Sequence, residues 1–227
     1  MLVKSKPLVA AGIVAVAVFF VTAMLVLGGY SRGVDNSIIA FFNGHESGGL
    51  TAVLKVITFS GEFYCYLVVC ALLLVIPQTR VDFGVPLTIV VVIAGALNAL
   101  LKVIFREPRP DTHRLISESG YGFPSGHAMF AAAFACMAIL LLIRFGRRRA
   151  MNVAGCVVLV LYALAVGTSR VYLGVHWPVD ILGGYLAGFF TMVATIMAWD
   201  AWSVPITTAT RHAWTKMLAR RGSGALS

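Results

Sequence analysis

The chain has 227 residues, of which 59% are hydrophobic and 12% are charged, and its formal net charge at pH 7 is +9. Soluble domains carry about 25% charged residues, and half of that share does not cover a water-facing surface of this size. The composition therefore argues against a soluble enzyme, a disordered chain or a nucleic-acid-binding domain. It predicts an integral membrane protein with a single membrane-embedded domain over residues 1–227.

Six apolar runs follow one another along the chain, and a helix needs about 20 apolar residues to cross a bilayer. We predict an all-α protein with six transmembrane helices, at residues 8–28, 61–77, 83–105, 125–143, 151–168 and 179–199. The segment Tyr30–Ser60, between the first two runs, is mixed in polarity. Its Ile and Phe residues at positions 38–42 predict a short amphipathic helix on the membrane face.

Small residues and cysteines within the apolar runs have structural interpretations. Gly184 and Gly188 form a GxxxG pattern, which indicates close helix packing, either within the chain or with a second copy. Each of the four cysteines lies in an apolar run, and none has CxxC spacing. We therefore expect neither a disulfide framework nor a zinc site.

The basic residues are distributed unevenly between the two sides of the predicted helices. The side with both chain ends holds eleven, namely Lys4, Lys6, Arg80, Arg144, Arg147, Arg148, Arg149, Arg211, Lys216, Arg220 and Arg221. The opposite side holds seven, namely Arg32, Lys55, Lys102, Arg106, Arg109, Arg114 and Arg170. Because Lys and Arg collect in cytoplasmic loops, we predict cytoplasmic termini in a multi-pass protein of the cell membrane.

Three polar segments lie at the outward ends of the predicted helices. They are Lys102–Pro110 after the third helix, Phe123–His127 at the start of the fourth, and Ser169–Asp180 between the fifth and the sixth. The topology places all three on the outer face, where charge at membrane depth marks functional candidates. The candidate residues are Lys102, Arg109, Ser125, Gly126, His127, Arg170, His176 and Asp180.

The chemistry of this set suits a phosphate group. Three permanent cations repel a metal ion and attract a compact polyanion, and the arginine fork matches phosphate oxygens. Ser125 and Gly126 open a predicted helix, whose free backbone N–H groups and dipole favour an anion. We therefore expect a phosphate site with neither metal nor cofactor, in which positive charge stabilises the transition state.

Two histidines divide the expected reaction. Asp180 follows His176 by four residues and can hold one imidazole nitrogen, which leaves the other free as a nucleophile. His127 has no such carboxylate close in sequence, and it is the better candidate for the general acid. The pattern predicts phosphoryl transfer to His176, followed by attack of water on the phosphohistidine.

The motifs KxxxxxxRP, PSGH and SRxxxxxHxxxD are complete at Lys102–Pro110, Pro124–His127 and Ser169–Asp180. In these motifs and their order the chain resembles the type 2 phosphatidic acid phosphatase superfamily, and within it the bacterial membrane-bound lipid phosphatases, over about Leu8–Trp199. The resemblance implies a six-helix membrane fold and metal-independent hydrolysis of lipid phosphates or pyrophosphates. It suggests undecaprenyl pyrophosphate, phosphatidylglycerol phosphate and phosphatidic acid as substrates, and the sequence does not choose among them.

The resemblance also implies a role for each candidate residue. His176 would be the nucleophile, Asp180 its partner and His127 the acid. The phosphate-binding residues would be Lys102, Arg109, Ser125, Gly126, His127 and Arg170. The division between the two histidines depends more on the family than on the spacing of the motifs.

Other interpretations stay open at this level. Lys102 could extend to the headgroups, Arg109 and Arg170 could anchor anionic lipid, and Ser125 could be only a helix cap. The protein could also be a phosphotransferase that passes the phosphoryl group to a second lipid, or a non-catalytic lipid-phosphate binder or transporter.

The loop before the second motif carries further polar residues. Glu118 and Tyr121 lie close to the motif and could touch the lipid headgroup. The remaining charged residues are expected to form a solvated network, and they are Arg106, Glu107, Asp111 and Arg114.

Overall fold

The computed structural model describes residues 6–111, 113–146 and 148–223, and every regular element within these ranges is helical. The first half contains α1 (Lys6–Leu27), α2 (Arg32–Asn43), α3 (Gly48–Ser60), α4 (Phe63–Val75) and α5 (Pro77–Thr79). The π-helical turn η1 (Arg80–Gly84) leads into α6 (Val85–Phe105), and α7 (Gly126–Phe145), α8 (Arg149–Tyr172) and α9 (Pro178–Ser223) complete the chain. The predicted all-α class is confirmed.

Five helical segments are long and apolar enough to cross a membrane: Lys6–Leu27, Pro77–Phe105, Gly126–Phe145, Arg149–Tyr172 and Pro178–Asp200. The pair α3–α4, bent by 55°, brings the number to six if it is counted as one span. This arrangement makes the chain a multi-pass membrane protein.

The predicted spans differ from the structure most clearly before α4, and the third span also starts earlier than predicted, at Pro77 instead of residue 83. The second predicted span starts at residue 61, whereas a separate helix, α3, already occupies Gly48–Ser60. The glycines at the start of α3 and Lys55 interrupt the apolar run, so that composition alone does not predict this helix. The last predicted span, 179–199, agrees with the apolar segment Pro178–Asp200, and α9 itself continues to Ser223, because hydropathy marks the membrane boundary rather than the end of a helix.

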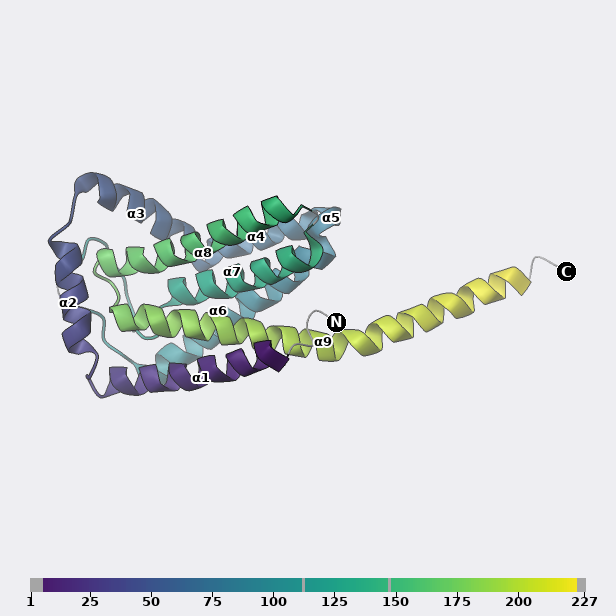
Figure 1. Ribbon diagram of the computed structural model, residues 1–227, viewed down its shortest axis with the longest axis horizontal. Coiled ribbons are helices and arrows are strands. Elements are labelled where there is room, and N and C mark those ends of the chain that lie inside the picture. The colour runs from purple at the N-terminus through teal and green to yellow at the C-terminus, as the bar shows by residue number, and fades with distance from the viewer. Residues whose placement is uncertain (1–5, 112, 147, 224–227) are drawn as a thin grey trace.

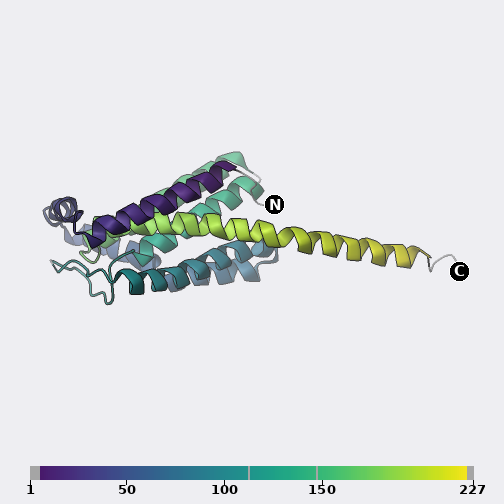
Figure 2. The same cartoon turned by 90° about the horizontal axis from the view of Figure 1, so that it is seen from below.

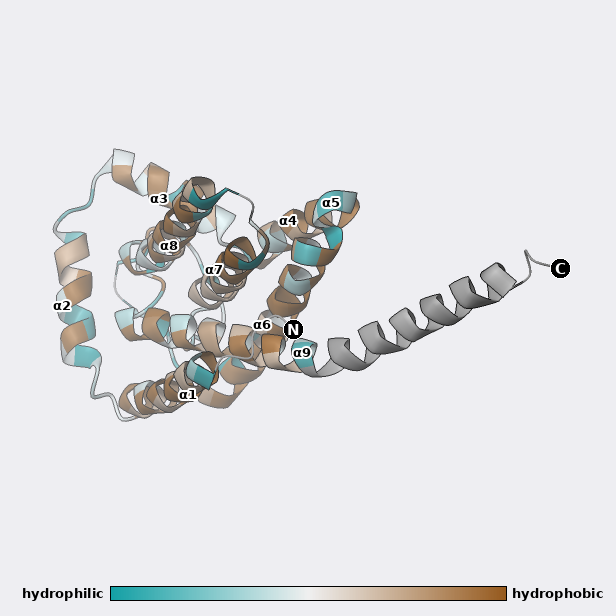
Figure 3. Ribbon diagram, turned by 45° about the vertical axis from the view of Figure 1, so that its right-hand side comes forward, coloured by the Kyte–Doolittle hydropathy of each residue, from teal (hydrophilic) through white to brown (hydrophobic). Residues whose placement is uncertain are grey.

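The helices form a bundle around α7, which contacts α4, α6, α8 and α9, while α1 packs along α9 (Figure 1). The predicted amphipathic helix is present as α2, which runs across one end of the bundle and alternates hydrophilic and hydrophobic residues (Figure 3). From a second side, α1 again lies alongside the N-terminal part of α9 (Figure 2).

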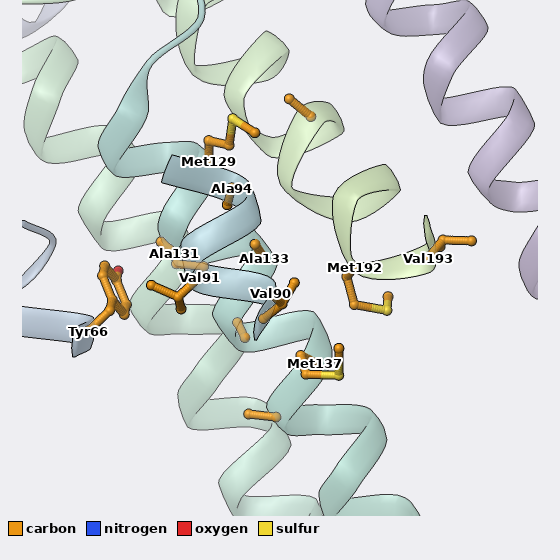
Figure 4. Close-up of a cluster of buried hydrophobic side chains, with 14 of the residues drawn as sticks. Tyr66, Val90, Val91, Ala94, Met129, Ala131, Ala133, Met137, Met192 and Val193 are labelled. Carbon is orange, nitrogen blue, oxygen red and sulfur yellow. The ribbon is translucent and has the colours of Figure 1, made fainter. Parts of the chain in front are cut away.

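The core is packed through small side chains on α7. The Cβ atom of an alanine at Gly184 would lie 2.9 Å from Cβ of Ala128, and one at Gly188 would lie 2.8 Å from Cβ of Ala132. The GxxxG pattern therefore packs α9 against α7 within the chain, where close backbone approach supplies the van der Waals contacts that hold membrane helices together. Next to this contact, the hydrophobic core also contains larger buried side chains from α4, α6, α7 and α9 (Figure 4).

Candidate active site

The three sequence motifs meet at the end of the bundle that α2 crosses. Ser125 donates its backbone N–H to the carbonyl of Asp180 at 3.0 Å, which joins the second motif to the third. Arg109 Nη1 donates to the carbonyl of Val175 at 2.8 Å, which joins the first motif to the third. Asn98 on α6 donates to the carbonyl of Pro124 at 3.2 Å. The prediction that the motifs share one face is confirmed.

His176 and Asp180 form a buried pair with side-chain exposures of 1% and 0%. Pro178 starts α9, so the first turn of this helix carries Asp180 back toward the imidazole. Asp180 Oδ2 accepts a hydrogen bond from His176 Nδ1 at 3.1 Å and another from the backbone N–H of Trp177 at 3.0 Å. The proton on Nδ1 leaves the lone pair of the imidazole on Nε2.

The guanidinium group of Arg109 lies next to that lone pair. Its Nη1 lies 3.0 Å from His176 Nε2, and its other donors bond to the carbonyls of Gly120 at 3.0 Å and Ser119 at 3.1 Å. Burial, and then the positive charges of Arg109 and Lys102, hold the pKa of His176 well below its ordinary value. His176 is therefore neutral near pH 7 and has an unprotonated nitrogen directed at a cation.

Arg170 is buried, with 1% of its side chain exposed. It donates from Nη1 to Thr58 Oγ1 on α3 at 2.8 Å and from Nη2 to Glu118 Oε2. The other oxygen of Glu118 lies 3.7 Å from Arg109 Nη2, so this carboxylate bridges the two guanidinium groups. Of the two residues expected near a headgroup, Glu118 thus occupies a position between the cations.

Three buried donors of the site have no hydrogen-bond partner among the described residues: the hydroxyl of Ser125, Nε2 of His127 and Nε of Arg170. Ser125 stands at the N-cap position of α7, yet its side chain makes no capping hydrogen bond within the described chain, which contradicts the interpretation as a simple cap. A side chain at Gly126 would place Cβ 3.0 Å from Asn98 Oδ1. The start of α7 is therefore closely packed at Gly126, and the unpartnered hydroxyl of Ser125 can bind an anion.

Lys102 and the loop around it complete the site. Lys102 Nζ donates to the carbonyls of Tyr121 and, at 3.4 Å, Gly122, so it holds the loop by the backbone instead of extending to headgroups. The solvated-network prediction is wrong for Glu107, which is 5% exposed and pairs with Arg32 on α2. The side chain of Arg32 also lies over the ring of Trp177, which ties α2 to the third motif.

Three polar residues near the motifs were missed by the sequence analysis because they lie outside the motifs. Thr58 supports Arg170, as described above. Asp35 on α2 accepts the backbone N–H of Val179 at 3.1 Å and so caps α9. Glu62, between α3 and α4, lies with Oε1 3.4 Å from His127 Nε2. Asp35 could not be singled out from the sequence, because the burial of its carboxylate on the amphipathic helix is known only from the fold.

Comparison with known proteins identifies the family to which this chain is similar. The family model of the PAP2 superfamily matches residues 83–203, which include all three motifs. The undecaprenyl-diphosphatase of Sulfolobus acidocaldarius is 31% identical over 170 residues, which cover 72% of this chain and 78% of that protein. The phosphatidylglycerophosphatase B of Bacillus subtilis is 38% identical over 98 residues, but the match covers 40% of this chain and 46% of that protein.

A solved structure has the same arrangement of helices. The crystal structure of the transmembrane PAP2 type phosphatidylglycerolphosphate phosphatase from Bacillus subtilis superposes with a TM-score of 0.72 at 24% sequence identity, and the match covers 84% of this chain and 96% of that one. Fold, motifs and sequence similarity point the same way, and the chain belongs to the PAP2 superfamily, that of the type 2 phosphatidic acid phosphatases.

Proposed function

We propose that this protein hydrolyses a lipid phosphate or pyrophosphate monoester through a phosphohistidine on His176. The observation that carries the proposal is the orientation of this imidazole. Asp180 binds Nδ1 at 3.1 Å, while Nε2 lies 3.0 Å from the guanidinium of Arg109. The lone pair that would attack phosphorus thus faces the guanidinium group that would bind the phosphate. A protein that only binds a phosphate has no need for a histidine oriented in this way.

The first step is attack of His176 Nε2 on phosphorus and cleavage of the bond to the leaving oxygen. The transferring group is surrounded by Lys102, Arg109, Arg170 and the hydroxyl of Ser125. The backbone N–H groups at the start of α7 complete this shell. Preorganised donors of this kind each contribute roughly 3 kcal/mol to transition-state stabilisation. The leaving oxygen takes a proton from His127, and the charge of Asp180 stabilises the imidazolium that forms on His176.

The second step is hydrolysis of the phosphohistidine. Neutral His127 now accepts a proton from water, whose oxygen attacks phosphorus and breaks the P–N bond. His176 returns to its neutral form with its proton on Nδ1, and phosphate leaves. The reaction needs no metal ion and no cofactor, because the chain itself supplies the cations that neutralise the phosphate charge.

A lipid is the substrate that suits this location, because the site lies at one end of helices long enough to span a membrane. The names of the relatives favour undecaprenyl pyrophosphate or phosphatidylglycerol phosphate, with phosphatidic acid as a third candidate. The distribution of basic residues supports cytoplasmic termini and a site at the outer face of the cell membrane. We treat residues 1–227 as one catalytic domain.

The proposal is tested by phosphate release from purified protein in detergent, with the three lipids as substrates. Wild type should release inorganic phosphate from at least one, and His176→Ala should lower kcat by about 10⁴-fold or more, because no second nucleophile replaces it. His113→Ala is the matched control, since this histidine pairs with Glu46 at 3.1 Å outside the site. Binding without phosphate release would favour a binder, and transfer of the label to a second lipid would favour a phosphotransferase.

A further inference from the structure

The break between α3 and α4 packs directly on the proposed site. Gly61 ends α3, and the two helices are bent by 55° at this point. A Cβ atom at Gly61 would lie 2.7 Å from Cγ1 of Val166 on α8 and 3.1 Å from Cδ2 of His127. The backbone of the break therefore lies so close to Val166 and His127 that a side chain at Gly61 would crowd both, although the break belongs to none of the three motifs.

Two side chains from this break contact charged residues of the site. Thr58, in the last turn of α3, accepts the hydrogen bond from Arg170. Glu62 precedes α4 with an extended backbone and makes no side-chain capping hydrogen bond within the described chain. Its Oε1 lies 3.4 Å from Nε2 of His127, and this ring is 9% exposed. The Glu62 side chain is directed at the histidine rather than engaged at the start of its own helix.

A general acid must carry a proton before the reaction, whereas burial, and then the nearby cation Arg170, disfavour a positive charge on His127. Arg170 repels a protonated imidazole, while Glu62 and Glu118 attract it. Glu118 is already paired with Arg170 and bridges toward Arg109. On the side of α4, Tyr64 and Cys65 are the titratable groups next to Glu62. Glu62 is therefore the carboxylate placed to hold the proton on His127.

We propose that Glu62 is a positioning residue for His127, a proposal that rests on the function proposed above. His127 Nε2 makes no hydrogen bond within the described chain, and Oε1 of Glu62, at 3.4 Å, is placed to accept Nε2–H when His127 is protonated. This leaves Nδ1–H as the proton given to the leaving oxygen. After that transfer, Nδ1 is unprotonated and takes the proton of the attacking water, while Nε2–H stays bonded to Glu62. The pair thus does for the acid what Asp180 does for the nucleophile, and it does so from a different part of the chain.

The test uses Glu62→Gln, which keeps the size of the side chain and removes its charge, in the full-length protein. The matched control is Glu46→Gln, because Glu46 also faces a histidine, His113, at 3.1 Å but outside the site. Two substrates are compared across pH: a lipid phosphate with an alkoxide leaving group, and p-nitrophenyl phosphate, whose leaving group needs no proton. The folded fraction in detergent is measured for each variant.

We expect Glu62→Gln to lower kcat on the lipid by about tenfold or more at pH 7.5, and to move the alkaline limb of the kcat profile about one unit toward lower pH. KM should change little, and the loss on p-nitrophenyl phosphate should be clearly smaller. Glu46→Gln should match wild type. Glu62→Asp, which keeps the charge but shortens the side chain, should show a smaller shift in the same direction, and it serves if Glu62→Gln does not fold.

An alkaline limb that stays at the wild-type pH in Glu62→Gln, or in Glu62→Asp if only that variant folds, would overturn the proposal. So would an equal loss on both substrates, because a merely structural role lowers the active fraction without distinguishing leaving groups. Combining Glu62→Gln with His127→Ala adds a further check, since no additional loss is expected once the acid is gone. If wild type itself releases no phosphate, the proposed function fails rather than this assignment.

Discussion

Asp180→Asn removes one negative charge beside the proposed nucleophile, His176, and keeps the shape of the side chain. The amide oxygen of the asparagine can still accept from His176 Nδ1 and from the backbone N–H of Trp177, because both hydrogen bonds reach Oδ2. The geometry of the imidazole should therefore persist. The change acts mainly on the positive charge that develops on His176 when Nε2 bonds to phosphorus.

The size of the effect follows from the separation of the two charges. Nδ1 lies 3.1 Å from Oδ2, and the charge of the imidazolium is spread over its ring. Two unit charges about 4 Å apart interact by about 4 kcal/mol at an effective dielectric constant of 20. Each 1.36 kcal/mol changes the rate tenfold, so kcat/KM should fall by about 10³-fold.

The assay is phosphate release from the best lipid substrate, with the melting temperature measured in the same detergent. Asp111→Asn is the matched control, because the side chain of Asp111 is 99% exposed and lies 3.5 Å from Arg114 on the loop. A kcat/KM for Asp180→Asn within about threefold of wild type would refute the electrostatic reasoning. A loss explained entirely by a lower folded fraction would refute it as well.

Three further predictions follow from the site. Because burial and nearby cations depress the pKa of His176, its neutral form persists below the ordinary histidine pKa of about 6.5. The acid limb of the kcat/KM profile should therefore lie below pH 6.5. A limb at or above that pH would contradict the depressed pKa. Arg109→Lys keeps the charge but replaces a guanidinium that donates to three backbone carbonyls at 2.8–3.1 Å. Both the melting temperature and kcat/KM should therefore fall, and kcat/KM by about 10²-fold or more. Wild-type values of both would show that neither the loop nor the phosphate needs the forked guanidinium group. In a background without the four native cysteines, Asp111→Cys should react with an impermeant thiol reagent in intact cells and Arg148→Cys should not, and the reverse pattern would invert the proposed orientation.

Much of the site could be predicted from the sequence because its residues are held in short motifs at helix ends. His176 and Asp180 are four residues apart, and one helical turn after Pro178 brings them together. Once the spans are counted, the topology alone places the three motifs on one face. The membrane spans could be predicted in a similar way, because each apolar run is a local feature of the sequence.

Contacts between distant segments could not be predicted in this way. Glu62 and His127 are 65 positions apart, and Thr58 and Arg170 are 112 positions apart. Nothing in the local pattern of Gly48–Ser60 shows that it forms a helix packed on α8, because its glycines and Lys55 lower its hydropathy. The partners of the proposed phosphate-binding residues could not be predicted either: Arg109 and Lys102 both donate to backbone carbonyls of the loop, and Glu118 bridges the guanidinium groups.

The central claim is a covalent phosphohistidine, and the stereochemistry at phosphorus tests it most directly. A lipid phosphorothioate made chiral with one oxygen isotope is hydrolysed in water enriched in another, and the configuration of the released thiophosphate is determined. Transfer to His176 and then to water involves two in-line displacements, each of which inverts phosphorus, so the account predicts net retention of configuration. Net inversion would show that water attacks the lipid phosphate directly, and it would contradict a nucleophilic role for His176.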